Sequence, residues 1–223
     1  MPEDPNFTVA LVTDAAAGIG QELAHLLAQD QYELILVDQN PDGLRSFAEH
    51  LRTEYGVAVT LITRDLSQMG AAQAVYQAVR AQGKQVDILA NDAGFGEHGL
   101  FLEPGIDRNS AVIHTNIVAL VELTYLFGSD MKQRGKSRIL QLGSTAAYTP
   151  SPRMAVYSAT KPFVLSSSEA LSNELQDSGL AATTLCPGAT DTDFFEQADA
   201  ENTNAAQGPL ADPKDVLGTG TKP

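Results

Sequence analysis

Short runs of aliphatic and β-branched residues alternate with longer segments of helical periodicity along most of this chain. A short run that is apolar throughout is typical of a strand in a parallel sheet, because helices cover both of its faces. Such runs predict strands at residues 7–13, 33–38, 57–63, 86–91, 137–142 and 181–186. The intervening periodicity predicts helices at residues 18–29, 41–55, 68–82, 107–134 and 153–178. Repeated strand–helix units predict an α/β fold, a doubly wound parallel sheet in three layers.

The composition excludes several classes of function. The chain has 223 residues, with 28 Asp and Glu against 14 Lys and Arg, which gives a net charge of −14. Because this charge repels phosphates, we expect no nucleic-acid partner and no docking on anionic membranes. The single cysteine, Cys186, excludes an internal disulfide, and four scattered histidines predict no metal site. Polar first residues and the lack of an apolar run near membrane-spanning length predict one soluble, cytoplasmic domain over residues 1–223.

Residues 189–223 differ in composition from the rest of the chain. They contain seven acidic residues against Lys214 and Lys222, and few apolar side chains beyond Phe194, Phe195 and Leu210. A long polar segment in a compact domain is usually a functional lid or a disordered loop. We therefore expect a mobile loop over residues 189–212 that covers the substrate, then at most one short helix from Pro213.

A glycine-containing turn follows the first predicted strand. Gly18 and Gly20 open the first predicted helix, where the backbone can approach a pyrophosphate whose charge the helix N-terminus favours. The second predicted strand ends in Asp38, whose carboxylate can accept hydrogen bonds from both ribose hydroxyls of adenosine. Each feature alone also fits an ordinary turn or a solvated acid. Together they predict a dinucleotide site that prefers NAD over NADP, since a carboxylate repels a 2′-phosphate.

A second group of polar residues lies further along the chain. Ser144 follows the fifth predicted strand, and Tyr157 and Lys161 share one face of the next helix because they are four residues apart. Taken alone, such a pair is typical of a solvated helix surface. A phenol, whose ordinary pKa is near 10, needs a neighbouring positive charge to act as a base at neutral pH.

Taken in order, these motifs and several others resemble the short-chain dehydrogenase/reductase family over about residues 7–195. Residues 13–20 resemble its Thr-Gly-x-x-x-Gly-x-Gly loop, residues 91–94 its Asn-Asn-Ala-Gly element, and residues 187–192 its Pro-Gly-x-x-x-Thr stretch. The resemblance assigns as catalytic residues Asn116, Ser144, Tyr157 and Lys161. It assigns as cofactor-binding residues Thr13, Asp14, Gly18, Ile19, Gly20, Asp38, Asp65, Leu66, Asn91, Ala93, Gly94, Tyr157, Lys161, Pro187, Gly188 and Thr192.

The resemblance implies a Rossmann-like NAD(P)-dependent oxidoreductase that transfers a hydride between nicotinamide and a secondary alcohol or ketone. Tyr157 would exchange a proton with the substrate oxygen, which Ser144 would orient. Lys161 would bind the nicotinamide ribose and lower the pKa of Tyr157, and Asn116 would connect the site to water. Two alternatives remain: a dinucleotide-binding sensor or scaffold without turnover, and a sugar-nucleotide epimerase or dehydratase, which usually carries a longer C-terminal domain.

Two aspartates depart from the family pattern. Asp14 stands where the family has the first glycine of the cofactor loop, and Asp92 stands where it has the second asparagine of Asn-Asn-Ala-Gly. Two carboxylates in neighbouring loops could crowd the cofactor and raise one pKa. In the simpler explanation, both point to solvent or Asp14 serves the ribose. We hypothesise that NAD binds more weakly here than is usual in the family.

Other features bear on assembly and on the substrate. Relatives usually end in a seventh strand, whereas residues 218–223 do not form a strand pattern, so we expect the last edge strand to be missing. Assembly as a homodimer or homotetramer through helices 107–134 and 153–178 stays available. Pro162 is expected to kink the second of these helices. Five residues predict a partly apolar substrate pocket: Phe95, Leu100, Phe101, Phe194 and Phe195. The acidic residues of the loop over residues 189–212 argue against anionic substrates.

Overall fold

The computed structural model describes residues 8–103 and 105–218, and it confirms the predicted fold class. The six strands are parallel and pair in the order β3-β2-β1-β4-β5-β6. Their bounds are β1 (Val9–Thr13), β2 (Glu33–Asp38), β3 (Val59–Thr63), β4 (Ile88–Asn91), β5 (Ser137–Leu142) and β6 (Leu180–Leu185). The order reverses between β1 and β4, which is where doubly wound sheets bind their ligands. Phe7, predicted to open the first strand, lies outside the described residues.

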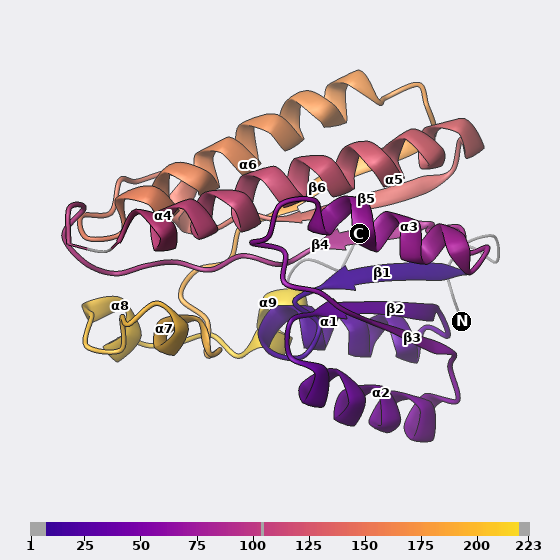
Figure 1. Cartoon of the computed structure of the whole chain (residues 1–223), viewed down its shortest axis with the longest axis horizontal. Coiled ribbons are helices and arrows are strands. Elements are labelled where there is room, and N and C mark those ends of the chain that lie inside the picture. Colours follow the sequence, from indigo (N-terminus) through magenta and orange to yellow (C-terminus); the bar gives the residue numbers. More distant parts are fainter. Residues whose placement is uncertain (1–7, 104, 219–223) are drawn as a thin grey trace.

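Helices cover both faces of the sheet and complete three layers (Figure 1). One face carries α1 (Gly18–Gln29) and α2 (Pro41–Tyr55), both with the predicted bounds. The other carries α3 (Ala71–Ala81), α5 (Leu120–Arg134) and α6 (Ala155–Glu174). Alternate residues of β1 enter opposite cores, because successive strand side chains point to opposite faces: Ala10 and Val12 pack with α1 and α2, and Leu11 with α3 and α5.

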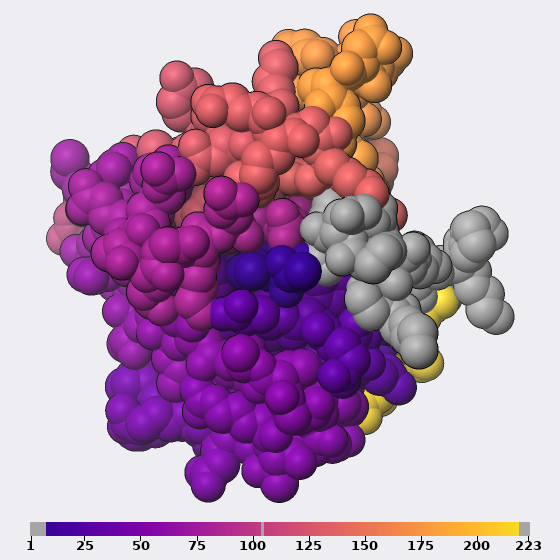
Figure 2. All heavy atoms as spheres, turned by 90° about the vertical axis from the view of Figure 1, so that its right-hand side faces the viewer, coloured from indigo at the N-terminus to yellow at the C-terminus, as the bar shows by residue number. Residues whose placement is uncertain are grey.

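The end of the molecule where the strands begin shows the same layering. There the indigo start of β1 lies between the purple-to-magenta part of the chain and the salmon-to-orange part that holds α5 and α6 (Figure 2). The start of β1 is tied to the sheet by Asp87, whose Oδ2 accepts hydrogen bonds from the backbone N–H groups of Thr8 at 3.0 Å and Val9 at 3.1 Å. The candidate functional side chains lie at the opposite end, where the parallel strands finish.

The helix predicted over residues 107–134 contains an irregular segment that the sequence did not indicate. It consists of α4 (Ile106–Ile113), a π-helical segment η1 (His114–Ala119) and α5. A π-helical segment holds more residues per turn than an α-helix and frequently occurs at functional sites. In contrast, α6 continues through Pro162 from Ala155 to Glu174.

The same helix corrects the expectation that no segment approaches membrane-spanning length. By length and composition, Ile106–Arg134 could cross a membrane, with a mean hydropathy of 1.5 over its most apolar window. In this fold, however, the buried side chains Leu123, Phe127 and Met131 of α5 belong to the hydrophobic core beside the sheet. Packing against the sheet thus accounts for the buried part of this helix, which is 39% of its most apolar window.

The segment after β6 has more structure than a single terminal helix. It contains α7 (Phe194–Gln197), α8 (Asn204–Gln207) and α9 (Pro213–Gly218). The short helix predicted from Pro213 is confirmed as α9, whereas the loop predicted before it contains two one-turn helices that were not predicted. Thr190 forms a parallel bridge with Ala211, which draws the two ends of the segment together. Val216 and Leu217 of α9 pack against Ile19 of α1. No seventh strand occurs within the described residues, and residues 219–223 lie outside them.

Candidate active site

Two adjoining cavities open at the end of the sheet where the strands finish, and each has a volume of about 470 Å³. The Tyr157 cavity is lined by Ser144, Tyr157 and Lys161. The Asp38 cavity is lined by Asp38 and by residues that follow β3 and β4. Both cavities share five lining residues, so they form one continuous depression; the shared residues are Asp14, Ala17, Gly94, Asp193 and Gln197.

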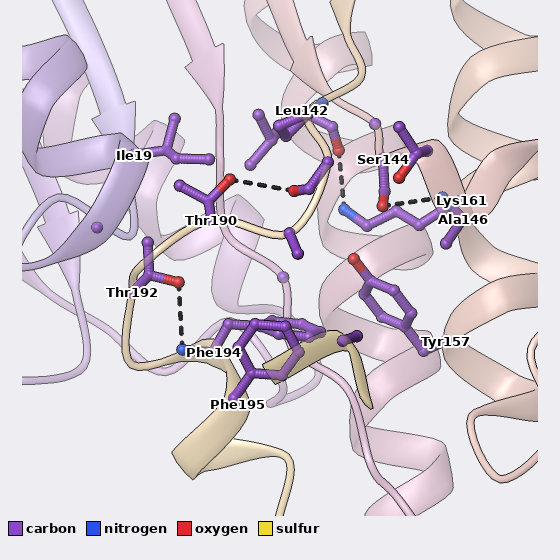
Figure 3. A pocket seen from close by; sticks show the side chains of 18 of the residues that line it. Ile19, Leu142, Ser144, Ala146, Tyr157, Lys161, Thr190, Thr192, Phe194 and Phe195 are labelled. Carbon is purple, nitrogen blue, oxygen red and sulfur yellow. Dashed lines mark hydrogen bonds between the residues drawn. The ribbon is translucent and has the colours of Figure 1, made fainter. Parts of the chain in front are cut away.

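Ser144, Tyr157 and Lys161 meet in the first of these cavities, as predicted. Figure 3 shows the Tyr157 hydroxyl pointing toward the space between Ser144 and Lys161. Ser144 hydrogen bonds to Tyr157, and its Oγ also accepts the N–H of Ala146 at 3.1 Å. The Nζ of Lys161 donates to the carbonyl of Leu142 at 2.9 Å and lies 5.5 Å from the centre of the Tyr157 ring. Because α6 places Tyr157 and Lys161 one turn apart, both side chains reach the end of β5.

The electrostatics of this trio differ from the expectation that Lys161 lowers the pKa of Tyr157. Burial raises the pKa of Tyr157 to about 12, and the Ser144 hydrogen bond opposes this only in part. Burial also lowers the pKa of Lys161 to about 8, while the carboxylates of Asp92 and Asp14 act to raise it. The ammonium group is thus held by the Leu142 carbonyl. Tyr157 is a protonated phenol at neutral pH and is able to donate its proton.

Asn116 lies within η1, buried at 1% exposure, and lines neither cavity. Its Nδ2 donates to the carbonyl of Phe95 at 3.0 Å and to Oγ1 of Thr160 at 3.1 Å, and its Oδ1 accepts the N–H of Phe95. The side chain therefore fastens the loop after β4 to α6. Its predicted connection to water stays a prediction.

Most of the residues predicted to bind a cofactor line one or both cavities. They are Asp14, Gly18, Ile19, Asp38, Asp65, Leu66, Ala93, Gly94, Tyr157, Lys161, Pro187, Gly188 and Thr192. Thr13, Gly20 and Asn91 do not. Thr13 Oγ1 accepts the N–H groups of Asp92 and Ala93, at 3.0 and 2.9 Å, while Asn91 Nδ2 donates to Thr124 and Gln141. These side chains hold the loops that form the cavities.

Asp38 is fixed at the end of β2 by two backbone hydrogen bonds. Its Oδ2 accepts the N–H of Ala16 at 2.9 Å, and its Oδ1 accepts the N–H of Asn40 at 2.8 Å. The side chain is 7% exposed, at the wall of the Asp38 cavity. An ionised carboxylate has lone pairs for further donors, so this position can still receive hydroxyl groups of a ligand.

Asp14 and Asp92 do not both point to solvent, so that part of the simpler explanation was wrong, while the alternative that Asp14 serves the ribose stays a prediction. Asp92 is 6% exposed, and its Oδ1 has no hydrogen-bond partner among the described residues. Gly20 separates the two aspartates: a β-carbon there would lie 2.4 Å from the Asp14 carbonyl oxygen and 2.6 Å from Asp92 Oδ2. Burial and repulsion by Asp14 raise the pKa of Asp92 well above its ordinary value, and burial and repulsion by Asp38 raise that of Asp14 to about 7.

The apolar part of the Tyr157 cavity comes from α7 and from Met154. The rings of Phe194 and Tyr157 lie 5.0 Å apart, and Phe195 packs edge-on against Phe194 (Figure 3). The expected contribution of Leu100 and Phe101 was wrong, because they are 51% and 62% exposed and line neither cavity. Met154, the residue before α6, also lines this cavity, and no sequence motif marks it.

Arg108 is a further site residue that the sequence analysis missed. Its Nε donates to Glu97 Oε2 at 2.6 Å, and its Nη2 donates to the carbonyl of Gln197 in α7 at 2.8 Å. The guanidinium also lies over the Phe95 ring, 5.0 Å from its centre. One side chain of α4 thereby connects the loop after β4 with the segment that carries Phe194. No sequence signal links Arg108 to Gln197, because 89 residues separate them.

Comparison with known proteins identifies the family. The short chain dehydrogenase family matches residues 8–203, and the chain belongs to it. Among curated relatives, the probable oxidoreductase EphD of Mycobacterium tuberculosis is 30% identical over 188 residues, covering 84% of this chain and 32% of that protein. A putative ketoacyl reductase of Streptomyces coelicolor is 32% identical over 186 residues, covering 82% and 71%. The chain thus spans about a third of the length of EphD.

Solved structures show the same fold. A short-chain dehydrogenase from Sphingobium yanoikuyae in complex with NADPH is 29% identical, with a TM-score of 0.89, covering 96% of this chain and 83% of that one. The bulky-bulky ketone specific alcohol dehydrogenase from Comamonas testosteroni is 28% identical, with a TM-score of 0.85, covering 96% and 81%.

Proposed function

We propose that this protein is an NAD(P)-dependent oxidoreductase that transfers a hydride between nicotinamide and a secondary alcohol or ketone. The observation that carries the proposal is the meeting of Ser144, Tyr157 and Lys161 in a cavity continuous with the one beside Asp38. Family membership and the oxidoreductase names of the relatives support it. Those names give no support to the alternative of a sensor or scaffold without turnover.

The residues present fit a nicotinamide dinucleotide. The continuous cavity leads from Asp38 past the N-terminus of α1 to Lys161. Ala17 caps α1 without a side-chain hydrogen bond, which leaves this helix end with the polarity that attracts a phosphate. At Gly18, with φ of 57°, a β-carbon would come within 3.1 Å of Thr192. Asp38, Asp65 and Leu66 would then hold the adenosine, and Lys161, Gly188 and Thr192 the nicotinamide half.

The chemistry assigned to this chain is proton transfer and positioning. When bound, the nicotinamide supplies or accepts the hydride. Ser144 orients the substrate oxygen beside the Tyr157 hydroxyl, and Tyr157 donates its proton to that oxygen as a carbonyl is reduced. A pKa of about 12 keeps Tyr157 protonated at neutral pH, which suits an acid in carbonyl reduction. The ammonium group of Lys161 places a positive charge 5.5 Å from the centre of the Tyr157 ring.

We further propose that NAD is preferred over NADP, on the position of the Asp38 carboxylate, and that the substrate is an uncharged, partly apolar alcohol or ketone. Phe194, Phe195 and Met154 line the Tyr157 cavity, whereas Asp14 and Asp193 would repel an anionic substrate. The ketone named for the Comamonas relative is consistent with this class. A cytoplasmic homodimer or homotetramer, assembled through the long helices, completes the proposal.

A test of the reaction compares the wild type with Tyr157→Phe on a panel of apolar ketones, followed by the absorbance of reduced nicotinamide. Loss of the phenolic proton donor should lower kcat by about 10²- to 10⁴-fold. Calorimetry should show that the variant still binds the dinucleotide, since the ring remains. Turnover of Tyr157→Phe at the wild-type rate would contradict the assignment.

A further inference from the structure

The start of α1 brings two acidic side chains from different loops into one small space. Asp14 follows β1 and Asp92 follows β4, and both line the Tyr157 cavity. The N–H of Gly20, in the first turn of α1, donates to the Asp92 carboxylate. Thr13 fixes the second loop by accepting the N–H of Asp92. These contacts hold the Asp92 carboxyl at the start of α1, beside the loop that carries Asp14.

The charge around this pair is mostly negative. Asp38, at the end of β2, faces both carboxyls, and Asp193, before α7, faces Asp14. Lys161 of α6 is the positive group that faces both aspartates, and the Cys186 thiol after β6 faces Lys161 in turn. Tyr157 stays neutral at ordinary pH. The Lys161 ammonium therefore faces Asp14 and Asp92, of which Asp92 is almost fully buried, while Asp38 and Asp193 add further negative charge around the pair.

A buried carboxyl such as Asp92 and a half-buried one such as Asp14 that line the same cavity resist ionising together, because each charge raises the proton affinity of the other. Asp92 Oδ1 has no hydrogen-bond partner in the described part of the chain, so no hydrogen bond stabilises a negative charge on that oxygen. Consistently, burial and repulsion raise the pKa of Asp14 to about 7 and that of Asp92 well above its ordinary value. The pair thus holds a proton near neutral pH.

On the basis of the proposed dinucleotide site, we propose that Asp14 and Asp92 form a proton-binding pair and that a dinucleotide enters the site together with a proton. The pyrophosphate adds negative charge near the N-terminus of α1, beside both carboxyls, and so strengthens their hold on the proton. By linkage, dinucleotide affinity must then fall as the pH rises and Asp14 loses its proton. The pair sets the affinity of the site, and glycine or asparagine at these positions would remove the dependence.

The experiment is calorimetric titration of the full chain with NAD in two buffers of different ionisation enthalpy, from about pH 6 to about pH 9. We expect uptake of up to about one proton near pH 8 and an affinity that falls by up to about tenfold per pH unit above pH 7. Asp14→Gly and Asp92→Asn should each reduce the uptake and tighten binding at the highest pH. Asp177→Asn, which removes an exposed charge beyond the end of α6, is the matched control and should change neither.

The outcomes separate the two proposals. Binding of NAD with no proton uptake at any pH, or uptake that neither variant reduces, would overturn the proton-binding pair and leave the proposed function standing. Failure of the wild type to bind either NAD or NADP across the whole range would overturn both. If Asp92→Asn does not fold, Asp14→Gly alone decides, because its backbone position favours glycine.

Discussion

Asp14 follows β1 with a backbone φ of 55°, in the left-handed region where a β-carbon is strained. Its pKa of about 7 lies above the ordinary value of 3.8, chiefly because the side chain is buried. Between these two values the folded chain holds a proton that the unfolded chain has released. By linkage, this carboxyl therefore makes the fold less stable as the pH rises from about 4 to about 7.

We expect Asp14→Asn to raise the free energy of unfolding at about pH 8 by more than about 1 kcal/mol, since one pKa unit corresponds to about 1.4 kcal/mol. The gain should be smaller at about pH 4, where the folded carboxyl is already neutral. Urea unfolding at both pH values measures the difference. An equal gain at both would assign the effect to the backbone conformation, which asparagine also tolerates better.

The proposed preference for NAD over NADP depends on the carboxylate of Asp38. Asp38→Asn keeps an acceptor for one of the two backbone N–H groups and removes the charge that opposes a 2′-phosphate. We expect the ratio of kcat/KM for NAD to that for NADP to fall by about tenfold or more, as loss of a charge-assisted hydrogen bond implies. Steady-state kinetics with both cofactors give the ratio. Asp42→Asn, an exposed acid in the first turn of α2, should leave it unchanged.

At the scale of elements, α7 owes its position above Tyr157 partly to Arg108. The guanidinium contacts Glu97, the Phe95 ring and the Gln197 carbonyl, and the N–H of His98 donates to the carbonyl of Ala198 at 2.9 Å. These contacts join the loop after β4 to the end of α7. Arg108 is thus a positioning residue for Phe194 and Phe195.

We expect Arg108→Ala to raise KM for an apolar ketone by about tenfold, equivalent to about 1.4 kcal/mol, with a smaller effect on kcat. Arg108→Lys should not restore KM, because an ammonium group cannot donate to both the Glu97 carboxylate and the Gln197 carbonyl and also stack on the Phe95 ring as the planar guanidinium does. Limited proteolysis should cut the variant faster within residues 194–207. Arg45→Ala, on the exposed face of α2, serves as the control; a KM equal to that of wild type in Arg108→Ala would refute the role.

The elements also show which parts of the structure the sequence could predict. The bounds of α1 and α2 were confirmed because local signals mark them, such as Asn40, whose side chain caps α2, and Gly56 at its end with φ of 69°. η1 and α7 were missed because contacts far along the chain hold them, such as those of Asn116 with Phe95 and of Arg108 with Gln197, whereas α8 is a single turn capped only by the nearby Thr203. The meeting of Ser144, Tyr157 and Lys161 could be predicted from ordered motifs. The burial of Asp92 and the position of Arg108 could not, because both depend on the packing of separate loops.

At the scale of the whole molecule, the long helices expose apolar side chains that suit assembly. Ile106 of α4 is 77% exposed, and Val121 and Tyr125 of α5 are 43% and 74% exposed. Val121 and Tyr125 share one face of the helix, being four residues apart. This surface supports the proposed homo-oligomer, since exposed apolar patches commonly mark interfaces.

We expect Tyr125→Glu to shift the protein toward monomers, because a buried unpaired charge at an interface is costly. Light scattering after gel filtration measures the molecular mass. Met69→Glu, at a side chain 87% exposed before α3, is the matched control and should leave the mass unchanged. A wild type that is already monomeric at high concentration would contradict assembly through these helices.

The π-helical segment η1 (His114–Ala119) has a consequence for changes in chain length. A π-helical turn is equivalent to an α-helix with one residue inserted, so deleting one residue here could restore an unbroken α-helix. The deletion would turn Asn116 by about 100° relative to α5. Its amide would leave Phe95 and Thr160, and the loop after β4 would lose its attachment to α6. In this helix a change of length, more than a change of side chain, would therefore be transmitted to the walls of both cavities.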